Sequence, residues 1–151
     1  MKFERKDLSF YPEDVLEYQL NRYERTANDF KSAFSYEAHA VFSAPGRSEI
    51  CGNHTDHNLG KAVGASVNLD IIAFAAKRDD GKICIKANGF DDINVDISDL
   101  EMRDDEKNSS TALVRGVCRK FADMGYKIGG FDAFTANDVL KGSGLSSSAA
   151  F

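Results

Sequence analysis

A helical repeat of apolar residues near the start of the chain is the strongest constraint on its fold. The apolar side chains recur at alternating spacings of four and three residues, at Leu16, Leu20, Tyr23, Ala27, Phe30 and Phe34. This period places them on one face of a helix over residues 12–34, and Pro12 suits its first turn. Glu13, Asp14 and Glu17 complement the positive end of the helix dipole. We therefore predict an amphipathic helix that is scaffold rather than site.

Strand patterns dominate the middle of the chain. A polar loop over residues 47–61 shows neither helical nor strand periodicity, and an Asp-Asp-Gly hairpin signal precedes residue 82. We expect a sheet whose neighbouring strands are mostly antiparallel. The predicted strands cover residues 39–43, 62–69, 71–77, 82–86, 93–97 and 130–136.

A second helix is predicted to begin at Ser109 or Ser110, either of which can act as its N-cap, and to end at Gly125. A third helix begins within residues 145–151. Helices and strands are mixed along the chain rather than strictly alternating, which predicts an α+β fold with a mixed sheet and helices packed on one face. The apolar positions of the second helix follow the same rule of three and four, at Leu113, Val117, Phe121 and Met124.

Composition limits the classes of partner and the compartment. The chain has 151 residues, of which 42% are hydrophobic and 28% charged, values typical of a globular domain. Its net charge of −5 argues against nucleic acid or an anionic membrane as a partner, because both call for a positive surface. The sequence has no apolar run that could cross a bilayer, no signal-peptide pattern, and no disulfide or zinc spacing among its three cysteines. We expect a cytoplasmic protein.

Residues 142–150, which read GSGLSSSAA, are the first of two segments that could carry chemistry. The glycines allow a tight turn, and the helix that follows presents unpaired N–H groups and a positive dipole end. A phosphate chain fits such a nest, with a serine free to bind the magnesium that accompanies a nucleotide. A dinucleotide fingerprint would need glycine at Ser147, a nucleophile elbow would need glycine at Ser148, and a Walker loop would need a Gly-Lys pair. A plain loop that caps a structural helix is the alternative.

The second segment covers residues 45–58. Between Arg47 and Asn58 it gathers one guanidinium, two carboxylates, two imidazoles and two carboxamides. Such a set can bind a polyol, because carboxylates accept from adjacent hydroxyls and amides both donate and accept. An arginine can also stabilise charge on a phosphoryl group in transfer. His54, Asp56 and His57 could bind a metal, but three ligands on one irregular loop with no distant partner form a poor site.

Together the two segments resemble the galactokinases. Residues 46–58, GRSEICGNHTDHN, are similar to the galactokinase signature G-R-x-N-L-I-G-E-H-T-D-Y-N. Residues 142–150 resemble the G-x-G-L-S-S-S-A-A phosphate loop of the wider GHMP kinases. The resemblance implies the ribosomal-S5-domain-2-like N-terminal half of the GHMP kinase fold. It also implies a helical lead-in over residues 1–36 and a truncated GHMP kinase N-terminal domain over residues 37–151.

The resemblance implies a role for each matching residue. Arg47 is the expected transition-state stabiliser, and the implied reaction transfers the γ-phosphate of ATP to the anomeric hydroxyl of galactose or a related hexose, as in galactose metabolism. The implied partners are this sugar and ATP, with Mg²⁺ bound by Ser148. The expected sugar-binding residues are Asn53, His54, Thr55 and Asp56, and those expected to bind the ATP phosphates are Gly142, Ser143, Gly144, Leu145, Ser146, Ser147 and Ser148.

Departures from the family pattern leave the substrate open. Asn53 stands where the family usually has Glu, so an amide that also donates replaces a carboxylate that only accepts; His57 replaces Tyr and Glu49 replaces Asn. The catalytic Asp, a second magnesium-binding acid and a C-terminal GHMP half would lie beyond Phe151, so we expect the chain alone to be inactive. The alternatives are a non-catalytic sugar-binding or sensor relative, a kinase for another sugar such as an N-acetylated hexosamine, and a purely structural domain.

Overall fold

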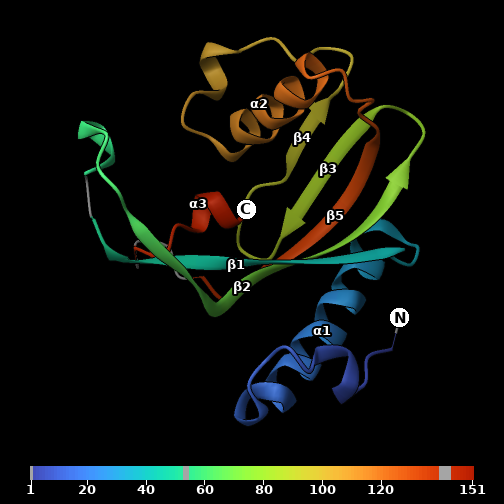
Figure 1. Ribbon diagram of the computed structural model, residues 1–151. Coiled ribbons are helices and arrows are strands. Elements are labelled where there is room, and N and C mark those ends of the chain that lie inside the picture. Colours follow the sequence, from blue (N-terminus) through green and yellow to red (C-terminus); the bar gives the residue numbers. More distant parts are fainter. Residues whose placement is uncertain (1, 53–54, 140–143) are drawn as a thin grey trace. The chain divides into compact units, whose positions relative to one another are not determined.

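The computed structural model of the chain describes residues 2–52, 55–139 and 144–151 (Figure 1). The helices are α1 (Leu16–Phe34), α2 (Ser110–Asp123) and the short α3 (Ser147–Ala150). The strands are β1 (Ala40–Cys51), β2 (Val63–Arg78), β3 (Lys82–Ala87), β4 (Ile93–Asp96) and β5 (Gly130–Asn137), and 3₁₀ turns lie at Arg5–Leu8, Glu13–Val15, Asp56–Asn58 and Asp104–Glu106. Within the described ranges, no helix is long and apolar enough to span a bilayer.

The five strands form one mixed sheet in the order β1-β2-β5-β3-β4, which confirms the predicted α+β class. Strand β4 is antiparallel to β3, with Ile83 opposite Val95. Strand β5 is parallel to β3, with Ile83 opposite Phe131, although the sequence predicted mostly antiparallel neighbours. The parallel pair follows from the connection: the chain passes through α2 between β4 and β5, and this crossover is long enough to return β5 in the direction of β3.

Strand β1 is longer than the sequence predicts. The expected strand over residues 39–43 continues to Cys51, so Arg47 lies on a strand and not in the polar loop. Strand β1 is at the edge of the sheet, and most of its side chains are exposed or half-buried. It therefore lacks the apolar alternation by which a strand is recognised from sequence.

Strand β2 is one strand where the sequence predicts two runs, over residues 62–69 and 71–77. Asp70 separates the runs, and it is buried in the structure. Its carboxylate accepts hydrogen bonds from Tyr11, Ser43 and Arg22, which satisfy the charge inside the protein. A strand can continue through a charge that is paired in this way, and an apolar pattern alone cannot show the pairing.

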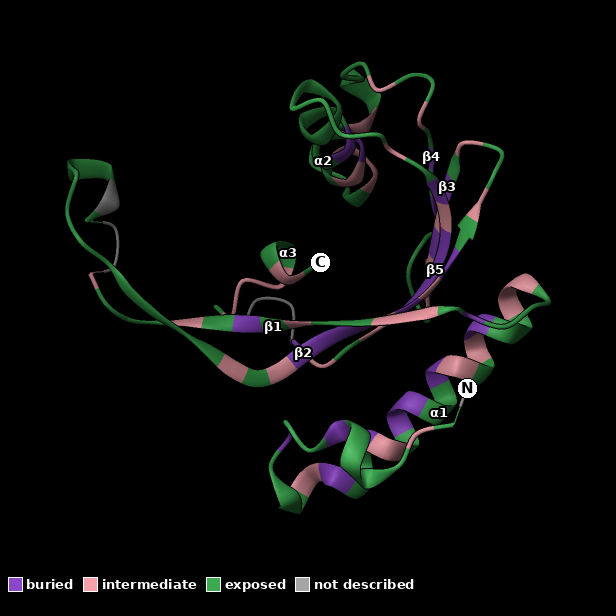
Figure 2. Ribbon diagram, turned by 45° about the vertical axis from the view of Figure 1, so that its right-hand side comes forward, coloured by how far each residue is buried: buried purple, intermediate pink, exposed green. Residues whose placement is uncertain are grey.

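Contacts divide the chain into two units. The first contains residues 25–41 and 74–135, and the second contains residues 2–24, 42–73 and 136–151. In the first unit, Ile83 of β3 packs with Cys118 of α2 in a buried cluster, and β3 and β5 are coloured as buried in Figure 2. The other members of this cluster are Ile85, Ile93, Val95 and Ala133.

Helices cover both faces of β3 within the first unit. Alternate side chains of a strand point to opposite faces, so Lys86 faces away from Ile83 and Ile85. The Lys86 Nζ atom lies 5.7 Å from the centroid of the Phe34 ring in α1. Asn88 Nδ2, just after β3, donates to Asp29 Oδ2 of α1 at 3.0 Å. The sequence predicted a single helical layer, whereas α1 and α2 lie on opposite faces here.

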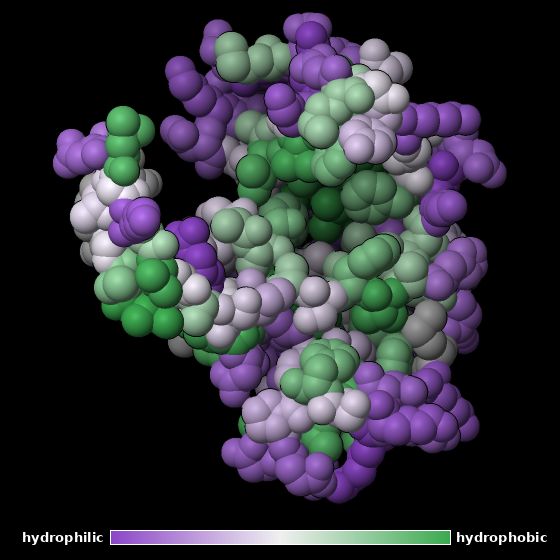
Figure 3. Space-filling view, in the orientation of Figure 1, coloured by the Kyte–Doolittle hydropathy of each residue, from purple (hydrophilic) through white to green (hydrophobic). Residues whose placement is uncertain are grey.

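Helix α2 occurs where predicted but presents a different face to the core. The Ala112 N–H donates to Ser109 Oγ at 3.1 Å, which confirms the N-cap, and Gly125 follows the helix with a φ of +84°. Buried Arg115 donates to both carboxylate oxygens of Glu106, at 2.7 and 2.6 Å. A paired arginine thus occupies an interior position that the apolar pattern could not identify. The apolar positions that recur at helical spacing are exposed and leave hydrophobic surface of the kind coloured green in Figure 3: Leu113, Val117, Phe121 and Met124.

Truncation of Ile83, which lies on β3 in the cluster with Cys118 of α2, and of Val117, on the exposed face of α2, tests this orientation. Ile83 is 1% exposed, so Ile83→Ala is expected to lower the free energy of unfolding by about 2–5 kcal/mol, because packed contacts are lost and a cavity remains. Val117 is 48% exposed, and Val117→Ala should change this free energy by less than about 0.5 kcal/mol. Urea unfolding followed by circular dichroism measures both, and equal losses would contradict the observed orientation.

Candidate functional site

The second unit contains the candidate site residues that the structure describes. Arg47 lies on β1, and Thr55 comes directly before the 3₁₀ turn Asp56–Asn58. Residues 144–146 lead into α3, which begins with Ser147 and Ser148. The fold brings Arg47 and Leu145 together, whereas the bonds of Thr55 stay within the loop between β1 and β2. The candidates Asn53, His54, Gly142 and Ser143, and the side chain of Asp56, lie outside the described part of the chain.

A backbone hydrogen bond joins the two segments that the sequence singles out. The Arg47 N–H donates to the carbonyl oxygen of Leu145 at 3.0 Å. Both groups belong to the main chain, so the bond sets the separation of the two segments independently of their side chains. The arginine of the first segment therefore lies beside the residues that lead into α3.

Two glycines allow this close approach. A Cβ atom at buried Gly46 would lie 3.0 Å from the Leu145 carbonyl oxygen, 3.1 Å from Val139 Cγ1 and 3.2 Å from Val67 Cγ2. A Cβ at Gly64 of β2 would lie 3.2 Å from Arg47 Cδ, so the Arg47 stem crosses the strand over this glycine. The missing side chains let β1 lie against Leu145 and let Arg47 extend across β2. Neither contact is visible in the sequence, although the glycines themselves are.

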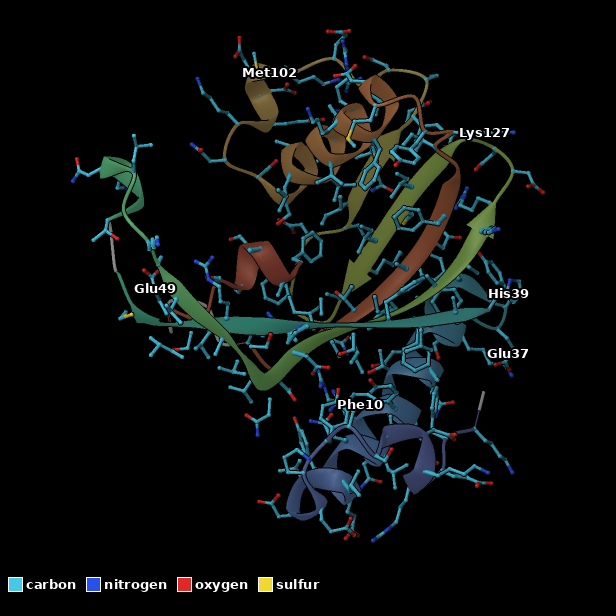
Figure 4. All side chains as sticks on the ribbon, in the orientation of Figure 1. Phe10, Glu37, His39, Glu49, Met102 and Lys127 are labelled. Atoms are coloured by element: carbon cyan, nitrogen blue, oxygen red, sulfur yellow. The ribbon has the colours of Figure 1, made fainter. Side chains whose placement is uncertain are left out.

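The Arg47 side chain is exposed at this position. It forms no ion pair with any other residue that the structure describes. Glu49 lies two positions further along β1, on the same face of the strand, and is labelled in Figure 4. An arginine in this setting presents five donors and a permanent positive charge to a bound group.

The loop between β1 and β2 is organised around Thr55. Its N–H and its hydroxyl both donate to the Gly52 carbonyl oxygen, at 3.0 and 2.7 Å, with the Lys61 carbonyl oxygen 3.1 Å from the hydroxyl as a second acceptor. The Gly60 N–H donates to the Thr55 carbonyl oxygen at 2.8 Å. Gly52 has a φ of +88°, and a Cβ there would lie 2.3 Å from the Lys61 carbonyl oxygen, so only glycine fits. The Thr55 hydroxyl proton is used to hold the loop.

Two left-handed residues turn the chain into α3. Gly144 has a φ of +76° and Ser146 a φ of +58°, and the sequence, which predicts a helix from residue 145, does not indicate this turn at a serine. The Ser146 carbonyl oxygen accepts from the N–H groups of Ala149 and Ala150, at 2.9 and 3.1 Å. The first amides of a helix have no intrahelical partner. At this turn they accompany an exposed hydroxyl, that of Ser148.

A buried charge cluster that the sequence analysis missed supports this unit. Arg22 Nη1 donates to Asp70 Oδ1 at 2.6 Å, and Tyr11 and Ser43 donate to Asp70 Oδ2. Burial, together with the hydrogen bond to Asp70, raises the pKa of the Tyr11 hydroxyl well above its ordinary value, so Tyr11 stays a donor. The available signal was a single aspartate inside an otherwise apolar strand pattern.

The described side chains form no group of three or more His, Cys, Asp or Glu residues that could hold a metal ion. His57 lies on the exposed 3₁₀ turn Asp56–Asn58. The three-ligand alternative also needs His54, which is outside the described residues. An oxygen-bound magnesium held partly by a nucleotide is a different case, because such ions keep few protein ligands.

The chain resembles known proteins both in sequence and in fold. The family model described as the galactokinase galactose-binding signature matches residues 28–77. The chain is 34% identical over 121 residues to the galactokinase of Streptococcus mutans, and 31% identical over 128 residues to that of Ligilactobacillus salivarius. The chain belongs to the galactokinase family. These alignments cover 79% and 83% of the chain but 31% and 33% of the relatives, so the chain spans about a third of the length of the galactokinases it matches.

Solved structures agree with this family. A Lactococcus lactis galactokinase complexed with galactose matches with a TM-score of 0.73 and 28% identity, over 84% of this chain and 34% of that one. A D-glycero-D-manno-heptose 1-phosphate kinase matches with a TM-score of 0.53 and 26% identity, over 73% of this chain and 38% of that one. The Methanococcus jannaschii mevalonate kinase, at 13% identity, has a TM-score of 0.59 over 75% of this chain and 37% of that one, and shows the shared fold. The predicted galactokinase-like fold is confirmed.

Substitution of Gly46 tests the contact between the two galactokinase segments. In Gly46→Ala the new Cβ would displace β1 from Leu145, so exchange of the Arg47 amide proton should rise roughly 2- to 10-fold, as expected from the loss of one backbone hydrogen bond. Hydrogen exchange followed by NMR measures it. Gly116→Ala in α2, where a Cβ meets nothing within 4 Å, is the control and should leave Arg47 unchanged. Unaltered exchange in Gly46→Ala would contradict the close approach.

Proposed function

We propose that the complete protein that carries this chain is an ATP-dependent sugar kinase of the galactokinase type. It transfers the γ-phosphate of ATP to the anomeric hydroxyl of galactose or a related hexose, as part of galactose metabolism in the cytoplasm. The observation that carries the proposal is the backbone hydrogen bond between Arg47 and Leu145. A kinase must hold its sugar and its nucleotide at one place, and this bond joins the two segments proposed to do so.

Arg47 is the proposed catalytic residue. Phosphoryl transfer spreads negative charge over the transferred group, and a fixed guanidinium beside that group stabilises the transition state. The exposed Arg47 side chain, with its backbone anchored to Leu145 and its stem lying over Gly64, suits this role. Anchoring matters because stabilisation by a charge that is already in position needs no rearrangement during the reaction.

The proposed sugar-binding residues are Asn53, His54, Thr55 and Asp56. The match of the galactose-binding signature over residues 28–77 supports this assignment. The hydrogen bonds of Thr55 to the Gly52 and Lys61 carbonyl oxygens support a role in shaping the loop that carries the other three. Carboxylate, imidazole and carboxamide groups held on one loop can recognise the hydroxyls of a sugar ring.

The proposed ATP-binding residues are Gly142, Ser143, Gly144, Leu145, Ser146, Ser147 and Ser148. The left-handed turn at Gly144 and Ser146 and the positive end of α3 suit a phosphate group, and the exposed Ser148 hydroxyl offers the kind of oxygen that Mg²⁺ prefers. Magnesium, when bound, would neutralise charge on the phosphates. The net charge of −5 does not oppose this binding, since backbone N–H groups rather than a basic surface hold the phosphates.

The remainder of the protein is proposed to complete the site. Because the chain spans about a third of its relatives, a C-terminal GHMP half with a catalytic Asp and a second magnesium-binding acid would act together with it. Within the chain, residues 1–36 would be a helical lead-in and residues 37–151 the GHMP kinase N-terminal domain. No nucleic acid or membrane partner is proposed.

A second candidate is a kinase for another sugar, such as an N-acetylated hexosamine. Asn53 and His57 favour it, since they replace the Glu and Tyr usual in the galactokinase signature. An amide at residue 53 donates as well as accepts, so it can pair with an acceptor on the sugar that a carboxylate would repel.

Replacement of Arg47 tests the proposed catalytic role. In the complete protein, Arg47→Ala is expected to lower kcat roughly 10²- to 10³-fold with little change in the Kd of the sugar, because the guanidinium acts on charge that develops during transfer. ADP release over a panel of hexoses measures kcat, and calorimetry without nucleotide measures the Kd. Arg119→Ala is the matched control, because Arg119 is held on the surface of α2 by Glu101 and Asp123.

An unchanged kcat in Arg47→Ala would reject the catalytic role. A wild-type protein that binds a sugar but phosphorylates none would reject the kinase and favour the non-catalytic sugar-binding relative.

The substitution Asn53→Glu tests whether residue 53 determines which sugar is preferred. The variant should raise the ratio of kcat/KM for galactose to that for other hexoses roughly tenfold, because a buried hydrogen bond made or left unsatisfied is worth about 1–3 kcal/mol. The same sugar panel measures the ratio. Asn94→Glu, which adds the same charge at an exposed position of β4, should leave the ratio as it was. Identical panels for wild type and Asn53→Glu would show that residue 53 does not select the sugar.

A further inference from the structure

We propose that Arg22 is a positioning residue for Arg47, acting through the chain segment at the end of β5. The proposal rests on the proposed function, since it gives a part in the kinase reaction to a side chain that does not touch the reacting groups. Arg22 lies in the part of α1 that belongs to the second unit, and its side chain is only 6% exposed. No motif of the sequence includes it.

The Arg22 guanidinium joins α1 to two neighbouring strands. Its Nη1 atom donates to Asp70 Oδ1 at 2.6 Å and forms an ion pair with Asp138 Oδ2 at 3.1 Å. Its Nη2 atom donates to the backbone carbonyl oxygens of Asp70 at 2.9 Å and of Ala136 at 2.8 Å. The two carbonyls belong to β2 and β5, which are adjacent in the sheet. A planar fork can serve carboxylates and carbonyls on both sides at once, which a lysine ammonium cannot.

Such a cluster fixes the register between two strands and adds little net stability. Removing two charges from water offsets most of their attraction, so apolar side chains of similar volume would hold α1 as well. A fork bonded to one carbonyl on each of two strands instead holds β2 and β5 at a defined offset. Arg22 does this where β5 ends, at Ala136, and where the chain leaves it, at Asp138.

The chain stays anchored as it leaves β5. The Asp138 N–H donates to the Asp70 carbonyl oxygen at 3.0 Å, and its carboxylate accepts from the Tyr18 hydroxyl at 3.0 Å. The Val139 N–H donates to Asn137 Oδ1 at 2.7 Å. Main-chain and side-chain hydrogen bonds thus hold both Asp138, which forms the ion pair with Arg22, and Val139, which follows it.

Val139 transmits this position to Arg47. Val139 is fully buried, and its Cγ1 atom lies 3.1 Å from the place of a Cβ on Gly46. It therefore packs against the backbone of the residue directly before Arg47. A shift of Asp138 moves Val139, and Val139 has no free space on the side of Gly46, so β1 must move with it. The position of Arg47 against Leu145 depends on Arg22 through these contacts.

Asp138→Asn is the principal test, made in the complete protein. The amide keeps the shape of the side chain and an acceptor for Tyr18, and it leaves the Arg22–Asp70 pair intact, so only the ion pair to Arg22 is removed. We expect kcat to fall roughly 10- to 100-fold, as a displacement of about an ångström can produce. The sugar Kd without nucleotide and the urea midpoint should stay at the wild-type values. Arg22→Lys, which keeps the charge and loses the fork, should act in the same direction.

Two matched controls separate position from charge. Arg25→Lys changes an exposed arginine of the same helix, whose Nε lies 3.9 Å from Asp29 Oδ2. Asp123→Asn removes an exposed carboxylate from α2, where it accepts from Arg119. Both should keep wild-type kcat and sugar Kd, because neither residue contacts the path from Arg22 to Arg47.

Exchange of the Arg47 amide proton gives a readout that does not need activity. It should rise roughly 2- to 10-fold in Asp138→Asn and stay unchanged in Asp123→Asn, since the bond to Leu145 is what the path holds. Unchanged exchange at Arg47 in Asp138→Asn overturns the proposal, and so does a kcat loss that a lower folded fraction explains. If the wild type phosphorylates no sugar and Arg47 exchange still rises, the proposed function fails and the positional link stands.

Discussion

The burial of the Asp70 carboxylate is the constraint on which the second unit depends. A charge taken out of water must be paired and hydrogen-bonded, and the donors here come from three segments: Tyr11 before α1, Arg22 within α1 and Ser43 on β1. One acceptor therefore fixes three parts of the chain against β2. A tyrosine hydroxyl is protonated at neutral pH, and burial raises the pKa of Tyr11 further, so it stays a donor to Asp70 in alkaline solution as well.

The contact between β1 and Leu145 connects the packing of the second unit with the proposed reaction. In the proposed function neither the signature segment nor the Gly/Ser segment binds both substrates alone, because the first is proposed to bind the sugar and the second the phosphates. The fold brings them into hydrogen-bond contact where Gly46 has no side chain to keep them apart. The reaction proposed for the complete protein requires such a contact, since a phosphoryl group can move only between groups that are held within reach.

The parts of the fold that sequence predicts are those set by local rules. The period of α1 and the Ser109 cap of α2 depend on residues a few positions apart, and both are confirmed. The hairpin predicted at residues 79–81 is wrong, because β5 lies between β2 and β3 in the sheet. The failures concern partners that are distant or absent from the pattern. Asp70 interrupts an apolar run in the sequence, but in the structure it is paired with Arg22. Buried Arg115 is likewise paired with Glu106. A hydropathy pattern treats each such charge as exposed, so it divides β2 and does not identify Arg115 as an interior position of α2.

The residues of the candidate site also differ in whether they can be recognised from local sequence. Arg47 is proposed from the sequence because a signature is a short stretch of residue types. Gly64, Val139 and Arg22 are not, because each matters only through a neighbour that the fold supplies. A glycine reports that space is needed but not what fills it, and a valine at the end of a strand resembles any core residue. Motifs therefore identify the groups that touch substrates, whereas the groups that hold them in position emerge only from the packing. The catalytic role proposed for Arg47 requires the position that the second set of residues gives it.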